Sequence, residues 1–240
     1  MEENNKVEVL GIDSNPTISI NNDTFFAVSL YKDKFLEEKE LSKFIKNVER
    51  LVRASPEYNN LITYMRQELN LNSCAYLNNI NTEKVAVEFH HTIFSLYDIV
   101  AIIINMFETE NKPFNSLVIA TEVINLHYSN LCGLIPLSKT IHQLVHSDEA
   151  FMIHKELVIG NVDVFVDKFR KYIPEELLGK YLFWCKYAEE NPKDKYLELE
   201  LFDQENRNIH VDRIAGINKL SKKESLENNK PVTELLEGQN

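Results

Sequence analysis

Four of the seven histidines in this chain fall into two tight clusters that offer the ligands of a metal ion. His90 and His91 end an apolar segment, and His142 and His146 lie four residues apart. Residues four apart on a helix share a face, so these last two imidazoles can reach one ion. Imidazole suits zinc, nickel and other borderline ions. Three histidines with one open position form a site for catalysis rather than a closed structural site.

The order of elements around these clusters strengthens the metal hypothesis. Residues 84–91 are predicted to form a strand with β-branched side chains, and residues 134–137 a short extended segment. Ser138 is a good N-cap for a helix that runs to about His146. An HxxxH pair alone is weak evidence for a metal site. Histidines that hydrogen-bond on a half-buried helix face also explain it, so this interpretation stays open beside the metal site.

The same order of strand, extended segment and helix resembles that of HNH endonucleases, whose core is called ββα-metal. It is most similar to divergent HNH-like proteins of bacteriophages, over about the middle third of the chain. The resemblance implies a fold in which a β-hairpin, a loop and a helix hold one divalent metal ion. It also implies hydrolysis of a phosphodiester. The segments that carry it are Val87-Glu88-Phe89-His90-His91, Gly133-Leu134-Ile135-Pro136-Leu137-Ser138 and His142-Gln143-Leu144-Val145-His146.

The resemblance also implies a role for each matching residue. His90, His142 and His146 match the metal ligands, and His91 matches the general base that activates water. The ion would be zinc, magnesium, manganese or nickel, and it would stabilise the charge that develops on the phosphate and the leaving oxygen. Lys139, in the first turn of the predicted helix, is the candidate phosphate contact. The central Asn of the family stands nine residues before the first helix histidine, where this chain has Gly133.

The charge of the chain bears on its partners. It has 26 basic and 37 acidic residues, a net charge of −11 and a pI near 5.2. Free-standing DNA binders usually present a basic face, because phosphate neutralisation supplies most of their non-specific affinity. The acidic balance counts against an autonomous DNA binder. We therefore expect that the DNA substrate implied by the resemblance is bound with the help of a protein partner that supplies basic surface.

Two other hypotheses remain open. In the first, a non-catalytic HNH-fold protein of a phage binds or regulates a protein complex, which the glycine at the Asn position favours. In the second, the chain is a helical adaptor with purely structural histidines.

The rest of the chain predicts the compartment. Three well-separated cysteines without a CxxC pair indicate a reducing environment, the cytoplasm of the bacterial host cell if a phage encodes the chain. The acidic, polar N-terminus is unlike a signal peptide. The longest apolar run, residues 99–106, is too short to span a membrane, so no membrane association is expected.

The pattern of apolar residues predicts an α+β protein: a ββα-metal core with inserted helices, an N-terminal β-hairpin or meander, and flanking helices. We expect a β-hairpin plus helices over 1–70 and the HNH-like core with its helical insertion over 71–150. A helical segment packed on the core follows over 151–202, and a polar, partly disordered tail over 203–240. The predicted helices cover 34–54, 56–69, 95–107, 115–129, 138–146, 161–172 and 174–190; the predicted core strands cover 73–77 and 84–91.

Overall fold

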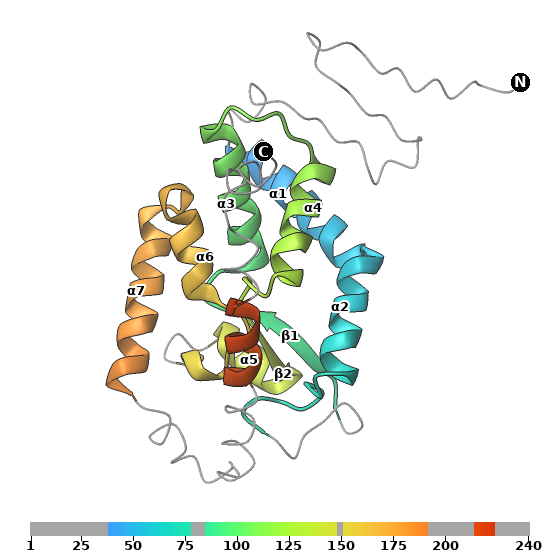
Figure 1. The fold of residues 1–240 in the computed structure, drawn as a ribbon, viewed down its shortest axis with the longest axis vertical. Coiled ribbons are helices and arrows are strands. Elements are labelled where there is room, and N and C mark those ends of the chain that lie inside the picture. Colours follow the sequence, from blue (N-terminus) through green and yellow to red (C-terminus); the bar gives the residue numbers. More distant parts are fainter. Residues whose placement is uncertain (1–37, 78–84, 148–150, 192–213, 224–240) are drawn as a thin grey trace, which may run out of the picture.

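The computed structural model describes residues 38–77, 85–147, 151–191 and 214–223. The predicted N-terminal hairpin, the end of the predicted helical segment 151–202 and both ends of the predicted tail lie outside these ranges. Within them the protein is mostly helical, with one two-stranded antiparallel sheet (Figure 1). No helix among the described residues is long and apolar enough to cross a membrane.

Most of the predicted helices are present with closely similar bounds. The helices α3 and α4 agree with the predictions over 95–107 and 115–129, and β2 is the predicted extended segment before α5. The elements are α1 (Glu38–Ala54), α2 (Pro56–Gln67), β1 (Val87–His91), α3 (Leu96–Thr109), α4 (Ser116–Tyr128), β2 (Leu134–Ser138), α5 (Lys139–Ser147), η2 (Lys155–Leu157), α6 (Val162–Phe169), η3 (Arg170–Tyr172) and α7 (Glu175–Glu190). A further helix covers residues 214–223.

Local sequence explains where the helices around the sheet begin. The Ser95 hydroxyl accepts a hydrogen bond from the Asp98 amide, and the Asp98 carboxylate accepts one from the Ser95 amide, which makes a capping box for α3. The Asn115 side chain caps α4 through the Val118 amide. Each cap satisfies backbone donors that have no partner inside the helix. The capping box allows α3 to begin after only four residues beyond the end of β1.

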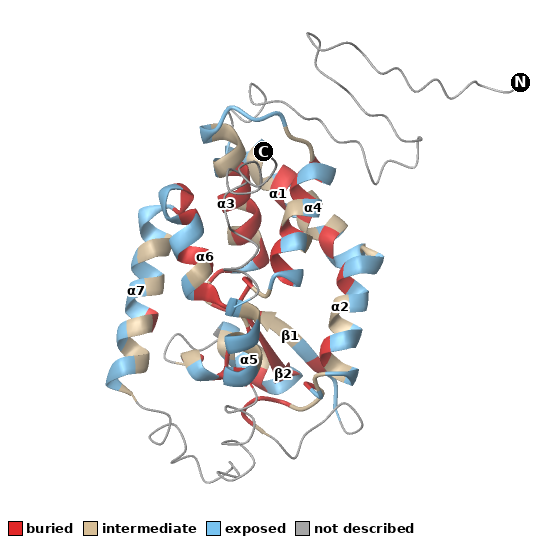
Figure 2. Ribbon diagram, in the orientation of Figure 1, coloured by how far each residue is buried: buried red, intermediate tan, exposed pale blue. Residues whose placement is uncertain are grey.

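The core lies between α1, α3 and α4 and extends beneath the sheet. The helix α3 is apolar on most of its surface, and Figure 2 shows its buried residues facing α1 and α4. Each such side chain contributes about 1.5–3 kcal/mol by leaving water. The fully buried large side chains are Ile45, Leu71, Leu96, Ile99, Ile102, Ile103, Ile119, Ile135, Leu137, Phe165 and Phe169.

The sheet pairs two strands that are far apart in the sequence. Val87 of β1 lies opposite Ser138 of β2, and His91 lies opposite Leu134, so the strands are antiparallel. The helices α3 and α4 are inserted between them, and β2 continues directly into α5. The order is therefore strand, helical insertion, strand and helix, as expected.

The predicted strand over 73–77 is wrong. The segment has a tight turn, in which the Leu77 amide donates to the Cys74 carbonyl, and the Ala75 amide donates to the Pro136 carbonyl of β2. Cys74 and Ala75 are buried with no exposed surface. The apolar character that predicted a strand instead anchors a loop beside β2, because burial alone does not determine backbone conformation.

Part of the predicted tail is packed against the rest of the protein. Residues 214–223 are helical, and Ile214 is fully buried beside Met65, Leu71 and Leu134. The Asn218 amide donates to the Val158 carbonyl at 2.9 Å, and its oxygen accepts from the Gly160 amide at 2.7 Å. This short helix is mostly polar and has no long apolar face. Buried Ile214 and the two hydrogen bonds of Asn218 thus hold it against the rest of the protein.

Candidate metal centre

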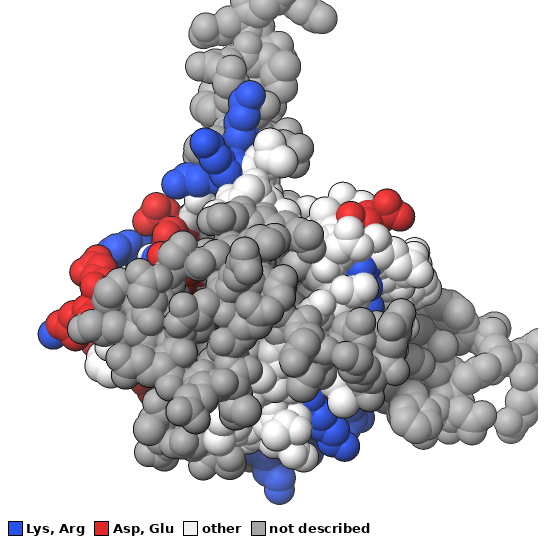
Figure 3. Space-filling model, turned by 90° about the horizontal axis from the view of Figure 1, so that it is seen from below, with Lys and Arg blue, Asp and Glu red and all other residues white. Residues whose placement is uncertain are grey.

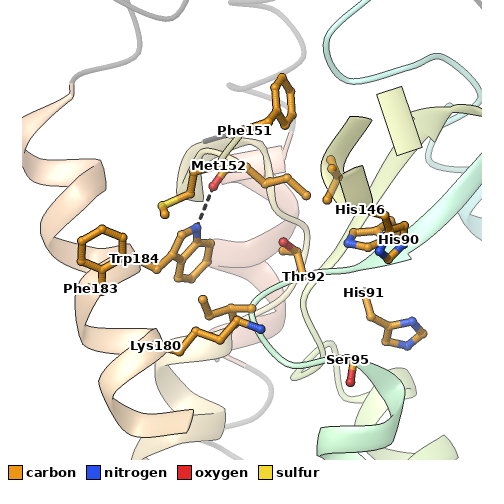
Figure 4. A pocket seen from close by; sticks show the side chains of 13 residues that line it. His90, His91, Thr92, Ser95, His146, Phe151, Met152, Lys180, Phe183 and Trp184 are labelled. Atoms are coloured by element: carbon orange, nitrogen blue, oxygen red, sulfur yellow. Dashed lines mark hydrogen bonds between the residues drawn. The ribbon is translucent and has the colours of Figure 1, made fainter. Parts of the chain in front are cut away.

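Three of the predicted histidines converge at the junction of the sheet and α5. His90 comes from β1, and His142 and His146 come from α5. One ligand nitrogen from each imidazole lies within 4.8 Å of the others, and the Nε2 atoms of His142 and His146 are 3.1 Å apart. Figure 4 shows His90 and His146 side by side at the edge of a pocket. Nitrogens this close can share one ion at the usual distance of about 2.0–2.1 Å after small side-chain adjustments.

The local fold explains why these rings meet. The Ser138 hydroxyl accepts from the Ile141 amide at 3.5 Å, at the start of α5. Ile141 is buried in the core and Val145 packs against it, so α5 lies with one side on the protein. His142 and His146 follow these two residues and sit on the neighbouring side of the helix, four residues apart.

Glu88 supports the cluster from behind. Its Oε2 atom lies 2.7 Å from Nδ1 of His142. A carboxylate can only accept here, so Nδ1 donates and the lone pair of the neutral His142 ring is on Nε2, next to His146. A carboxylate that orients an imidazole in this way is common around metal ions. Glu88 precedes His90 by two residues on the same strand face, a spacing that would have identified it in the sequence.

Burial favours a neutral His90. Desolvation, together with the charges that His142 and His146 would carry, lowers its pKa to about 4 from an ordinary value of 6.5. Lys180 acts in the same direction, more weakly. A neutral imidazole has the lone pair that a metal ion needs, so His90 is ready to bind one at neutral pH.

His91 lies away from the other three. Adjacent strand residues point to opposite faces, and His91 is only 7% exposed. Its Nε2 lies 2.8 Å from Nε2 of His127, whose Nδ1 lies 2.7 Å from the Val123 carbonyl. Figure 4 shows the His91 ring pointing away from His90 and His146.

These contacts fix the protons of the buried pair. The Val123 carbonyl can only accept, so Nδ1 of His127 donates and its Nε2 is an acceptor when the ring is neutral. His91 must then donate through Nε2, which leaves the His91 lone pair on Nδ1. His127 therefore orients His91, a relationship that a sequence distance of 36 residues does not indicate.

The buried pair predicts a loss of stability in acid. Burial lowers the pKa of His127 to about 4, the Val123 hydrogen bond opposing this effect, and burial also lowers the pKa of His91. His127 becomes protonated near pH 6.5 in the unfolded chain, but only near its lowered pKa of about 4 in the folded chain. The free energy of unfolding should therefore fall between these values, by on the order of 3 kcal/mol from His127 alone.

Urea denaturation at several pH values between 7.5 and 4 measures this loss. The carboxylates of the chain also titrate in this range, so the parent is compared with His127→Gln, whose amide oxygen can still accept from His91. The variant should show the shallower dependence on pH. Identical slopes for the two proteins between pH 6.5 and 4 would contradict the assignment.

A pocket of about 300 Å³ opens beside the histidine cluster. His90 and His146 form one part of its wall, and Lys180, Phe183 and Trp184 of α7 form another (Figure 4). Lys180 was missed in the sequence because α7 begins almost thirty residues after α5 ends and carries no motif. Lys139 is exposed on α5 and does not line this pocket.

The comparisons with known proteins place the chain in a phage family. A family model described as bacteriophage G278-like virion protein matches residues 2–228. The chain belongs to this family. No curated protein and no solved structure matches it. The prediction that this is a phage protein is thus confirmed. Because the family is one of virion proteins, support for the nuclease hypothesis must come from the histidine site itself.

Packing accounts for the glycine at position 133, where the HNH resemblance would place an Asn. A Cβ atom there would lie 2.9 Å from both the Thr92 carbonyl oxygen and a methyl group of Val162. The Gly133 carbonyl accepts from the Thr92 amide at 3.0 Å, directly after His91. The backbone itself therefore ties the end of β1 to the start of β2, and a larger side chain would separate them.

Proposed function

We propose that this virion-family protein binds one divalent metal ion through His90, His142 and His146 and hydrolyses phosphodiester bonds of DNA, as an HNH-type nuclease does. The observation that carries the proposal is the convergence of three imidazoles, one oriented by Glu88, at the edge of an open pocket. Three histidines leave a coordination position for water or a phosphate oxygen. The order of two antiparallel strands and a helix is that of a ββα-metal core.

The residues around the ion have distinct tasks in this mechanism. The ion, zinc or another of the divalent metals, would supply Lewis-acid stabilisation of the phosphate oxygens. His91 carries its lone pair on Nδ1, and it lines the same pocket, so it is the candidate base for the attacking water. Its Nε2–H bond to His127 would hold the ring during proton transfer. Lys180 replaces Lys139 as the side chain best placed to meet a phosphate, because it lines the pocket.

The family suggests where such an enzyme acts. A virion protein is carried in the phage particle and would meet DNA there or after entry into the host cytoplasm. The net charge of −11 favours a second protein that supplies basic surface for DNA. Both the particle and the partner are parts of the proposal.

A specific observation favours a second candidate function. The His91 side chain is 7% exposed and already bonded to His127, so it is poorly accessible to water. In this alternative the ion fastens α5 to β1 and the protein is a non-catalytic component of a phage protein complex. Metal binding would then stabilise the fold without supporting cleavage.

Metal content and nicking of supercoiled plasmid decide between these functions. The full chain is stripped with a chelator and reloaded with zinc, magnesium, manganese or nickel in turn. Stoichiometric binding with metal-dependent nicking supports the nuclease. Binding that raises the melting temperature without nicking under any ion supports the structural alternative. Failure of every ion to bind would contradict both.

A further inference from the structure

The pocket beside the histidine cluster has two chemically different ends. We propose that it takes one unpaired nucleotide of a single-stranded nucleic acid, with the phosphate toward the histidines and Lys180 and the base against the aromatic residues of α7. The inference deepens the proposed function by naming its substrate class, and it rests on that function for the metal at the phosphate end.

The polar end suits a phosphate group. His90 and His146 of the histidine cluster line the pocket, and Lys180 of α7 faces the same space (Figure 4). Lys180 forms no ion pair with any residue of the described ranges, so its ammonium group is available to an incoming anion. Thr92 also lines the pocket, and its hydroxyl can donate to a phosphate oxygen, whereas the Ser95 hydroxyl already donates to the Asp98 carboxylate at 2.8 Å.

The other end is apolar and aromatic. Phe151, Met152, Phe183 and Trp184 line it. The Trp184 ring is fixed because its Nε1 donates to the Ile153 carbonyl at 2.7 Å. Phe183 is 59% exposed, and a base that stacked on its ring would remove apolar surface from water. Trp184 is only 2% exposed, so Phe183 offers the stacking contact used by proteins that bind single strands, and the indole forms part of the pocket wall.

Size and charge favour a single strand over a duplex. A volume of about 300 Å³ lies at the lower end of the range for small-molecule sites, and a paired base cannot enter it without leaving its stack. Duplex DNA also requires many cations, because it carries one negative charge per about 1.7 Å. Among the residues that the structure describes, Lys180 is the only Lys or Arg that lines the pocket. On the face in Figure 3 the basic side chains that are visible form separate groups.

The fluorescence of Trp184 reports binding directly, since the chain contains one tryptophan. The zinc-treated full chain is titrated with thymidine 5′-monophosphate and, separately, with deoxyribose 5-phosphate, which lacks the base. We expect both to change the emission and the nucleotide to bind about 5- to 150-fold more tightly, the gain typical of stacking one base. Equal affinities would overturn the inference.

Neighbouring residues of α7 provide a matched pair of variants. Phe183→Ala should remove most of the preference for the nucleotide, whereas Leu182→Ala should keep it, although both side chains are 59% exposed. Lys180→Ala should weaken both ligands by a similar factor, and Lys180→Arg should restore them. If Phe183→Ala and Leu182→Ala behave alike, the base does not lie against Phe183.

Competition between oligonucleotides completes the test and keeps the two proposals separate. A single-stranded oligomer should displace the nucleotide at lower concentration than its duplex, and tighter binding of the duplex would overturn the inference. Base-dependent quenching in a protein that binds metal but never cleaves would contradict only the nuclease. Cleavage without base-dependent quenching would contradict only the nucleotide pocket.

Discussion

The His146→Ala variant should lose most of the affinity for zinc that the parent chain has. His146 supplies one of three imidazoles, and its Nε2 is 3.1 Å from that of His142, so its removal leaves two ligands from the protein. The loss should exceed the 10–100-fold typical when a supporting residue behind a ligand is removed. Equilibrium dialysis against a zinc-selective chelator measures it, with metal content determined for each protein.

Gln143→Ala is the matched control, because Gln143 is exposed on the same helix and lies outside the cluster. It should bind zinc like the parent. Glu88→Ala should fall between them, with a 10–100-fold loss, because Glu88 orients His142 without reaching the ion. Equal affinities for His146→Ala and Gln143→Ala would show that His146 is no ligand, and the three-histidine metal site would then be abandoned.

The histidine cluster could be predicted because its geometry is mostly local. The spacing of His142 and His146 places both on one helix face wherever that helix lies. Only their meeting with His90 needs tertiary structure, and the β2–α5 connection supplies it, since β2 pairs with β1 and runs into α5 without a loop. Glu88 belongs to this local class as well, because residues two apart on a strand share a face.

Features that depend on distant contacts could not be predicted from the sequence. Residues 73–77 have the composition of a strand, but they turn beside β2, where the Ala75 amide donates to the Pro136 carbonyl and the Leu77 amide donates to the Cys74 carbonyl. Lys180 reaches the pocket only because α7 packs near η2, through contacts such as that of Trp184 with Ile153. The environment of His91 likewise depends on α4, since His127 of that helix supplies the hydrogen bond.

Variants of His91 separate an effect on cleavage from an effect on stability. In the nuclease proposal His91 is the base, so His91→Gln should slow cleavage about 10²–10⁴-fold while zinc affinity stays that of the parent. The glutamine amide can donate to Nε2 of His127 as the imidazole does, and it fills a similar volume, so the fold should be retained. Nicking rates and zinc affinity are measured on the same preparations.

His91→Ala shows what the same position contributes to stability. It leaves Nε2 of His127 buried without its donor and opens a cavity beside Tyr58, whose ring stacks on His91. The free energy of unfolding should fall by about 2–4 kcal/mol, measured by urea denaturation, whereas His91→Gln should lose much less.

The cleavage rates of the two variants then decide the role of His91. Both variants lack the base but differ in stability, so equal cleavage rates far below that of the parent would assign His91 to proton transfer. A His91→Gln variant that cleaves at the parent rate would remove His91 from the chemistry. The buried pair would then serve only to hold β1 against α4, and the base would have to be sought among the residues that line the pocket.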